Sequence, residues 1–529
     1  MTFSPADSVV LLALLGAAGA LIVAAHATRI PYPILLVVGG LALAFVPGIP
    51  DIALPPDLVL VAVLPPLLYG TAFFTSLREF RSNVKPISLL AVGLVLTTMV
   101  LVAVVAHEVT NISWAGSFVL GAIVSPTDPT AATAIATRLG LPRNLVAVIE
   151  GESLVNDGTA LVAYKYAVGA VVAGSFSLAS ASWHFVLNVG GGIAIGLAVG
   201  YLIRQVRIRV ENSPVEITIS VLSGYFAYLP ATAAGVSGVL AAVAAGIYLG
   251  WHTLELTNAQ TRLQGQSVWE ILFFLLNGLL FALVGLQLPQ ILDALSGRPA
   301  GTLLGYALVV YAVVIGARFL WIFPGTYLSR LRRREVMDGV VEEPWKGATV
   351  LTWSGMRGAV SLAAALALPL TIDAGGPFPD RELIIFLTFS VILGTLVIQG
   401  LTLPALIRVL DLREDPKADK EEAKARIYAA EAAIARLEEL IDEDWVREDT
   451  AERLRGLYNF RSNRFRTRFA PDGDVQGIEQ RSLSYQRLLR ELIEAERRAI
   501  RDLQRRGRID DEVMRRVVRD LDLEELRLN

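Results

Sequence analysis

Runs of about 20 apolar residues recur along the first 410 residues of this 529-residue chain. An apolar stretch of about 20 residues is long enough to cross a bilayer as a helix. Because 54% of the residues are apolar and the mean hydropathy is +0.53, we expect an all-α polytopic membrane protein. We count thirteen such segments, centred near residues 16, 40, 66, 96, 126, 158, 195, 222, 242, 278, 313, 358 and 394.

Charged residues divide the chain into two parts. Residues 1–410 contain 21 Lys and Arg and 21 Asp and Glu, whereas residues 411–529 alone contain 26 and 29. This contrast predicts a transmembrane domain over 1–410 and a cytoplasmic helical domain over 411–529, with a regulatory or dimer-stabilising role. The tail is net negative, which argues against nucleic-acid binding. The chain has no cysteine, so disulfides and thiol metal sites are excluded.

Basic residues in the connections predict the orientation. Fifteen Lys and Arg lie on one set of alternate connections, and the other set contains only Arg298 and Arg381. Basic loops stay in the cytoplasm. We therefore expect thirteen spans in the cell inner membrane, with the N-terminus outside the cell and the tail in the cytoplasm. No Lys or Arg precedes the first apolar segment, so we interpret that segment as a spanning helix in the lipid bilayer and not as a cleaved signal.

Two of the apolar segments contain helix breakers. Pro126 and Pro129 enclose Thr127 and Asp128 in one segment, and Gly355 and Gly358 enclose Arg357 in the other. Prolines in a membrane helix leave backbone carbonyls without partners, and such interruptions occur where the backbone lines a site. Interrupted helices in corresponding places of two halves are typical of secondary transporters built from inverted repeats. We therefore expect inverted repeats with two unwound helices.

The segment over residues 145–171 contains Glu150, Glu152, Asp157 and Lys165. An ionisable group at the centre of a membrane helix costs about 3 kcal/mol or more, so such groups mark functional sites. Helical spacing places Ser153 and Asp157 on one face, and Glu152 and Asn156 on another.

A monovalent cation that has lost part of its water binds carboxylate, hydroxyl and carbonyl oxygens. Asp157, Asp128, Ser153, Thr127 and the freed carbonyls near Pro126 are the predicted set, with Asp157 and Asp128 as the Na⁺ carboxylates. Structural interpretations stay open beside this one. Asp128 before Pro129 also fits a helix N-cap, and the Ser153 hydroxyl also fits a bond to its own helix. Arg357 fits a partner for the negative ends of broken half-helices. Glu150 and Lys165 have no assigned role.

The chain resembles the bacterial sodium/proton antiporters of the electroneutral monovalent cation/proton antiporter family, which are related to the animal sodium/proton exchangers. The resemblance extends over nearly the whole membrane part, in the runs SPTDPTAATAI (125–135), EGESLVNDGTALVAY (150–164), GLLFALVGLQLP (278–289), ARFLWIFP (317–324) and WSGMRGAVSLAAALALP (353–369). It implies a homodimer, two crossed and partly unwound helices, and an elevator movement.

The resemblance also implies residue roles. Asp157 would bind Na⁺ and H⁺ in turn, with Asn156 as a further residue of the cation and proton site, and Glu152 would form a structural ion pair with Arg318. One difference is that Gly70 stands where some close relatives have a glutamate, so a third carboxylate is absent.

Competition at one carboxylate then predicts the activity. A buried Asp157 is neutralised by either a cation or a proton, and only a neutral site crosses the membrane cheaply. We expect electroneutral exchange of Na⁺, or of Li⁺ or K⁺, for H⁺, with no enzymatic activity and no cofactor besides the transported ions. Two alternatives are a cation channel and an intramembrane aspartyl protease that uses Asp128 and Asp157. Broken helices favour alternating access over a channel, and no motif that positions a hydrolytic water accompanies the two aspartates.

Overall fold

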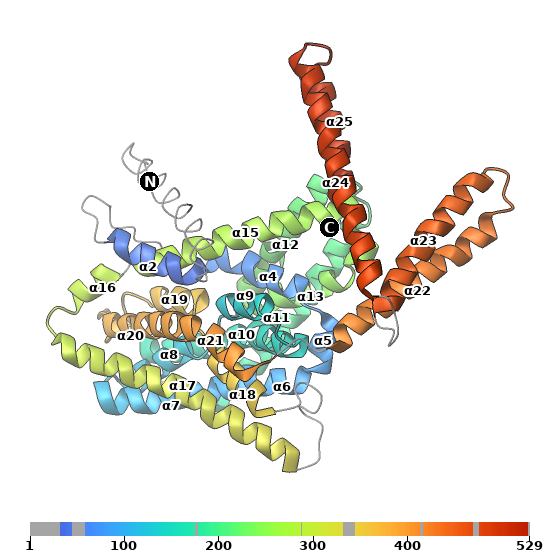
Figure 1. Cartoon of the computed structure of the whole chain (residues 1–529). Helices are drawn as coiled ribbons and strands as arrows, with labels where there is room; N and C mark the ends of the chain where they lie inside the picture. The colour runs from blue at the N-terminus through green and yellow to red at the C-terminus, as the bar shows by residue number, and fades with distance from the viewer. Residues whose placement is uncertain are drawn as a thin grey trace. The chain divides into compact units, whose positions relative to one another are not determined.

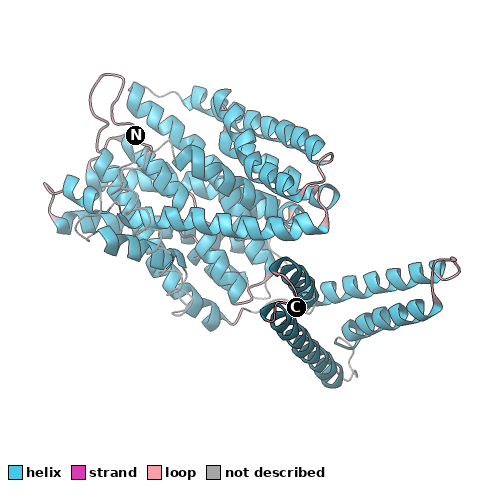
Figure 2. Ribbon diagram, turned by 90° about the horizontal axis from the view of Figure 1, so that it is seen from above, coloured by secondary structure: helices cyan, strands magenta, loops and turns pink. Residues whose placement is uncertain are grey.

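The computed structural model describes residues 19, 32–44, 59–174, 178–286, 288–331, 344–412, 416–468 and 475–526. The chain divides into two compact units, Met1–Glu414 and Asp415–Asn529. Helices make up nearly all of the regular structure in the described residues (Figure 2), beside one isolated bridge between Thr371 and Pro377. The expected all-α class is confirmed. The first predicted span, centred near residue 16, lies outside the described residues.

The other twelve predicted centres fall in described helices or in the breaks between them. The main elements of the first unit are α2 (Tyr32–Ala44), η1 (Val59–Val63) with α4 (Leu64–Phe74), α6 (Val84–Ser88) with η2 (Leu89–Leu94) and α7 (Val95–Thr110), α8 (Trp114–Val124), α9 (Thr130–Arg138), α10 (Arg143–Ala173), α11 (Leu178–Arg207), α12 (Ser213–Ala233), α13 (Gly238–Trp251), α15 (Ala259–Leu286), α17 (Ala300–Leu331), α18 (Pro344–Trp353), α19 (Ala359–Leu366), and α20 (Arg381–Gly394) with η3 (Thr395–Gln399) and α21 (Gly400–Leu410).

Length and composition alone qualify four of the described helical stretches as membrane spans: Val84–Thr110, Phe185–Arg207, Ala300–Tyr327 and Arg381–Leu410. Several other helices of this unit are shorter or carry more polar residues, as expected where helices pack around a polar site. The number of thirteen spans and the inverted repeat stay predictions.

Both predicted interruptions are confirmed. Between α8 and α9 the chain is non-helical from Ser125 to Pro129, and between α18 and α19 it is non-helical from Ser354 to Gly358. The two breaks touch, because the Asp128 amide donates a hydrogen bond of 2.7 Å to the Met356 carbonyl. Four helix ends therefore meet inside the unit, where unpaired backbone groups need partners.

The helices form two packed groups on either side of this meeting point. One apolar cluster joins residues of α7, α8, α10, α17 and α20, and another joins residues of α4, α11, α12, α13 and α15. In the view of Figure 1, α12 and α15 run along one side, α7 and α17 along the other, and α8, α9, α10 and α19 lie between them. The breaks therefore lie in the interior of the membrane unit.

Small residues set the packing of α13 against α4. A Cβ atom at Gly246 would lie 2.5 Å from the Tyr69 carbonyl oxygen, and one at Gly250 would lie 2.2 Å from that of Phe73. Glycines four residues apart present one smooth helix face, on which a second backbone approaches closely, as is common in membrane proteins. This contact joins α4 closely to α13.

The second unit contains four described helices: α22 (Pro416–Leu440), α23 (Glu448–Arg468), α24 (Val475–Arg505) and α25 (Asp511–Leu526). Gly507, at φ +67°, follows α24, as a glycine commonly does at the end of a helix. Arg497 of α24 forms ion pairs with Glu525 and Asp522 of α25. The Arg497 guanidinium donates hydrogen bonds to Glu525, the larger cause, and to Asp522, and these bonds raise its pKa. The role of this unit stays a prediction.

Candidate cation site

Asp128 joins the two interrupted helices. Its Oδ1 accepts the Thr130 amide at 2.9 Å, and its Oδ2 accepts the Ala359 amide at 3.3 Å. These amides lie at the N-termini of α9 and α19, where backbone N–H groups lack helical partners and the helix dipole favours negative charge. Asp128 therefore caps two half-helices at once, and both of its oxygens accept hydrogen bonds.

Gly358 leaves the space for this carboxylate. A Cβ atom at Gly358 would lie 1.9 Å from Asp128 Oδ2. We therefore expect Gly358→Ala to push the carboxylate off α19 and to cost about 1–3 kcal/mol in stability, as overpacking does. Thermal unfolding of purified protein measures the loss. Gly316→Ala in α17 is the matched control, since nothing lies within 4 Å of its Cβ position; equal melting temperatures for both variants would contradict the prediction.

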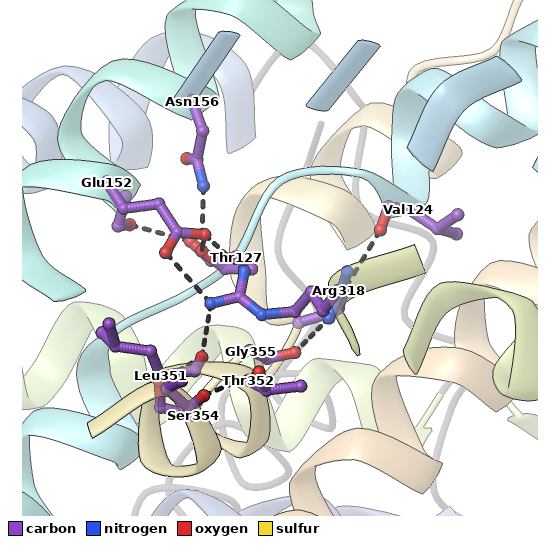
Figure 3. Close-up of polar contacts among 12 residues, drawn as sticks. Val124, Thr127, Glu152, Asn156, Arg318, Leu351, Thr352, Ser354 and Gly355 are labelled. Atoms are coloured by element: carbon purple, nitrogen blue, oxygen red, sulfur yellow. Dashed lines mark hydrogen bonds and ion pairs between the residues drawn. The ribbon is translucent and has the colours of Figure 1, made fainter. Parts of the chain in front are cut away.

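A chain of hydrogen bonds connects α10 to the first break (Figure 3). Asn156 Nδ2 donates to Thr127 Oγ1 at 2.8 Å, and Thr127 Oγ1 donates to Glu152 Oε1 at 3.1 Å. Ser153 Oγ donates to the Thr127 carbonyl at 2.8 Å, so this hydroxyl bonds across to the break and not to its own helix. Three residues of α10 thus hold one unwound residue in place.

Glu152 and Arg318 form an ion pair that extends this chain to α17. Arg318 Nη1 contacts Glu152 Oε1, and Arg318 Nη2 donates to Glu152 Oε2 at 3.0 Å. Both side chains are only 2–3% exposed. The same Nη2 donates to the Leu351 carbonyl at 2.7 Å, near the C-terminus of α18. The pair is bidentate, the geometry in which a buried Arg and carboxylate interact most strongly.

Arg357 bonds to carbonyl groups at the other helix ends. Its Nε donates to the Val124 carbonyl at 3.0 Å, at the C-terminus of α8, and its Nη1 contacts the Gly355 carbonyl. Its backbone amide donates to Thr395 Oγ1 at 3.0 Å. A cation at helix C-termini offsets the negative end of the dipole. The four helix ends are thus balanced by one carboxylate and two guanidinium groups.

A cavity of about 70 Å³ lies beside the breaks. By the same measure one water needs about 10–15 Å³, so a cation and a few waters fit. It is lined by residues of four regions: Leu64, Leu67, Leu68 and Thr71 of α4; Ser153, Leu154 and Asp157 of α10; Asn277 of α15; and the two breaks with the adjoining helix starts, Pro126–Thr130 and Gly358–Ser361.

Asp157 has a different environment from Asp128. It is 6% exposed and lines the cavity. No described residue forms a hydrogen bond or an ion pair with its carboxylate, whereas both oxygens of Asp128 accept backbone amides. A buried charge needs a partner. A cation or a proton in the cavity would supply it.

The predicted residues thus separate into two sets. Asp157, Asp128, Ser153 and Thr127 line the cavity. Asn156, Glu152, Arg318 and Arg357 lie outside it and hold the breaks in position.

Sequence reasoning missed Asn277, which faces the same cavity from α15. It is an uncharged residue in an apolar segment, and the only available signal was a lone amide at membrane depth.

Position 70 is closed by aromatic rings. A Cβ atom at Gly70 would lie 2.6 Å from both the Phe273 and the Trp269 ring. The rings of α15 therefore occupy the space that a larger side chain on α4 would need. This packing explains why position 70 accommodates only a glycine.

Comparisons with known proteins agree with this geometry. The family model for the transmembrane sodium/hydrogen exchanger matches residues 10–409. An uncharacterized Na⁺/H⁺ exchanger of Mycobacterium tuberculosis is 36% identical over 98% of this chain and 96% of its own. A sodium, potassium, lithium and rubidium/H⁺ antiporter of Bacillus pumilus is 33% identical over 78% of this chain and 63% of its own.

Among solved structures, the fold is similar to that of the sodium proton antiporter from Methanocaldococcus jannaschii. The TM-score is 0.62 at 21% identity, over 78% of this chain and 98% of that one. The match shows that the two proteins share a fold. With the family match over most of the membrane unit, it follows that this chain belongs to the sodium/hydrogen exchanger family, as a multi-pass cell-membrane antiporter that exchanges cations for protons and not as an enzyme.

Proposed function

We propose that this chain exchanges one Na⁺ for one H⁺, with Asp157 as the single carboxylate that binds the two ions in turn. The main support for this proposal is the contrast between the two aspartates of the cavity. Asp128 accepts hydrogen bonds from two backbone amides, whereas Asp157 has no described partner. Since a cation and a proton neutralise Asp157 equally, each half-cycle moves the same charge. Ser153 and Thr127 add oxygen atoms on the same side of the cavity.

The position of the cavity supports alternating access. Its apolar wall comes from α4, and its polar wall comes from α10 and the two breaks. An apolar cluster that includes Leu64, Leu68, Leu154 and Ala363 continues this boundary between the two walls. No hydrogen bond or ion pair between described residues joins α4 to the α10 wall, and such an apolar boundary permits one wall to slide against the other. We propose that the α10 wall moves with the ion bound, in an elevator movement.

The experiment is ion exchange by purified protein in proteoliposomes. We expect a Na⁺ gradient to drive proton movement, and an imposed membrane potential to leave the rate unchanged. Titration with Na⁺, Li⁺ and K⁺ under the same conditions gives the cation preference, which we propose to include Na⁺. A rate that changes steeply with the potential would contradict the one-for-one count, and single-channel currents would contradict exchange itself.

The remaining parts of the proposal concern assembly and orientation. The chain would form a homodimer in the lipid bilayer, with the N-terminus outside and the tail in the cytoplasm. The chain has no cysteine, so one cysteine introduced into the tail reads the orientation. We expect a membrane-impermeant thiol reagent to label it only in opened cells, and labelling in intact cells would reverse the orientation.

A further inference from the structure

Asn277 is a polar side chain without a partner in the cation cavity. It lies on α15, lines the cavity and is 7% exposed. No described residue forms a hydrogen bond with its carboxamide. Burying an unpaired amide in an apolar environment costs about 1–3 kcal/mol in proteins. A group kept at this cost needs a partner that enters the cavity.

Several hydroxyl groups of the cavity already have partners. Thr127 Oγ1 bonds to Glu152 and Asn156, and Thr71 Oγ1 donates to the Leu67 carbonyl at 2.9 Å. Ser361 Oγ has no partner, but the atom is buried out of reach. Besides the Thr130 hydroxyl, Asp157 and Asn277 are therefore reachable groups in the cavity that no described residue binds.

The two groups belong to different walls. Asp157 is on α10, which packs against α8, whereas α15 packs against α2 and α12. Asn277 follows Trp269 and Phe273 at intervals of four residues, so the three share one face of α15. The two aromatic rings cover Gly70, and the amide reaches the cavity beyond them. Asn277 thus supplies polar atoms to a wall that is otherwise mostly apolar.

We propose that Asn277 Oδ1 is a neutral ligand of the transported cation, supplied by α15 while the ion is bound at Asp157. Amide carbonyl oxygens are good ligands for hard cations. A neutral ligand raises cation affinity without adding a second titrating charge, so the one-for-one count is retained. This inference rests on the proposed function and assigns a residue that sets the affinity of that site.

The test is the Na⁺ dependence of exchange by the full-length protein in proteoliposomes. We expect Asn277→Ala to raise the KM for Na⁺ about 10-fold, the lower end of what losing a supporting group costs a metal site. The KM should rise more than the maximal rate falls. At subsaturating Na⁺ the pH profile should move to higher pH, because protons then compete better for Asp157. Asn277→Asp should lower the KM, since a carboxylate attracts the cation more strongly.

Gln266→Ala is the matched control. Gln266 lies on the same helix, its carboxamide bonds to Glu270, and it does not line the cavity. The KM for Na⁺ of this variant should equal that of the wild type. A KM for Asn277→Ala equal to that of the control would overturn the proposal, as would a lower maximal rate at unchanged KM. If the alanine variant does not fold, Asn277→Asp decides, and an unchanged or higher KM there overturns it. Failure of the proposed function gives a different result. The wild-type protein would then show no exchange, or the Asp157→Asn variant would still exchange.

Discussion

Replacing Asp157 with asparagine is expected to abolish cation/proton exchange while the protein stays folded. The substitution keeps the shape of the side chain and removes the one cavity carboxylate that has no described partner. Without the carboxylate charge, the site binds neither a cation nor a proton, so no ion is carried. Since an unpaired buried charge destabilises a fold, we also expect the melting temperature to be equal to or higher than that of the wild type.

Two measurements check this expectation: exchange in proteoliposomes and thermal unfolding in detergent. Asp373→Asn, at an exposed position outside the cavity, is the control and should exchange like the wild type. Exchange by Asp157→Asn above that of empty liposomes would refute the assignment. A melting temperature well below that of the wild type would instead show that Asp157 is needed for the fold.

The second large effect concerns the ion pair of Glu152 and Arg318. Arg318→Met or Glu152→Gln removes one partner and leaves an uncompensated charge or a broken network at a site that is 2–3% exposed. We expect each single variant to lose about 3–5 kcal/mol in stability. The double variant should lose clearly less than the sum, because neither charge is then left alone. Thermal unfolding of the four proteins gives the coupling between the two side chains.

Glu255→Gln is the matched control for this cycle. Glu255 pairs with Arg204 at 3.1 Å, but its side chain is 64% exposed, and exposed pairs contribute about 0–1 kcal/mol. Single variants of the buried pair that are as stable as this control would show that water reaches the pair. Additive losses in the double variant would show that the two side chains act independently.

The sequence predicted the parts of the site that follow from local chemistry. Two prolines three residues apart, Pro126 and Pro129, leave backbone carbonyls without partners and so predict a break. The spacing of Ser153 and Asp157 puts them on one face of a helix. Both expectations hold in the structure. The pairing of Glu152 with Arg318 was inferred from the family resemblance, because no spacing relates residues 166 positions apart.

Other features depend on tertiary packing. The Ala359 amide bonds to Asp128 although 231 residues separate them, so the double cap could not be read from either segment. The Thr127 hydroxyl also connects Asn156 to Glu152, a contact that neither segment shows on its own. Asn277 carries no charge and follows no repeat, so its place in the cavity depends on how α15 packs. Among the described residues, the π-helical stretches η1, η2 and η3 likewise had no recognised sequence signal.

The aromatic cover over Gly70 has a consequence for how such transporters diverge. A glutamate at this position would collide with Trp269 and Phe273, so a single substitution there is expected to be deleterious in this background. The rings would have to become smaller first, and each intermediate would have to remain a working protein. In a lineage that starts from this packing, the rings on α15 are therefore expected to be replaced before an acidic residue appears at position 70.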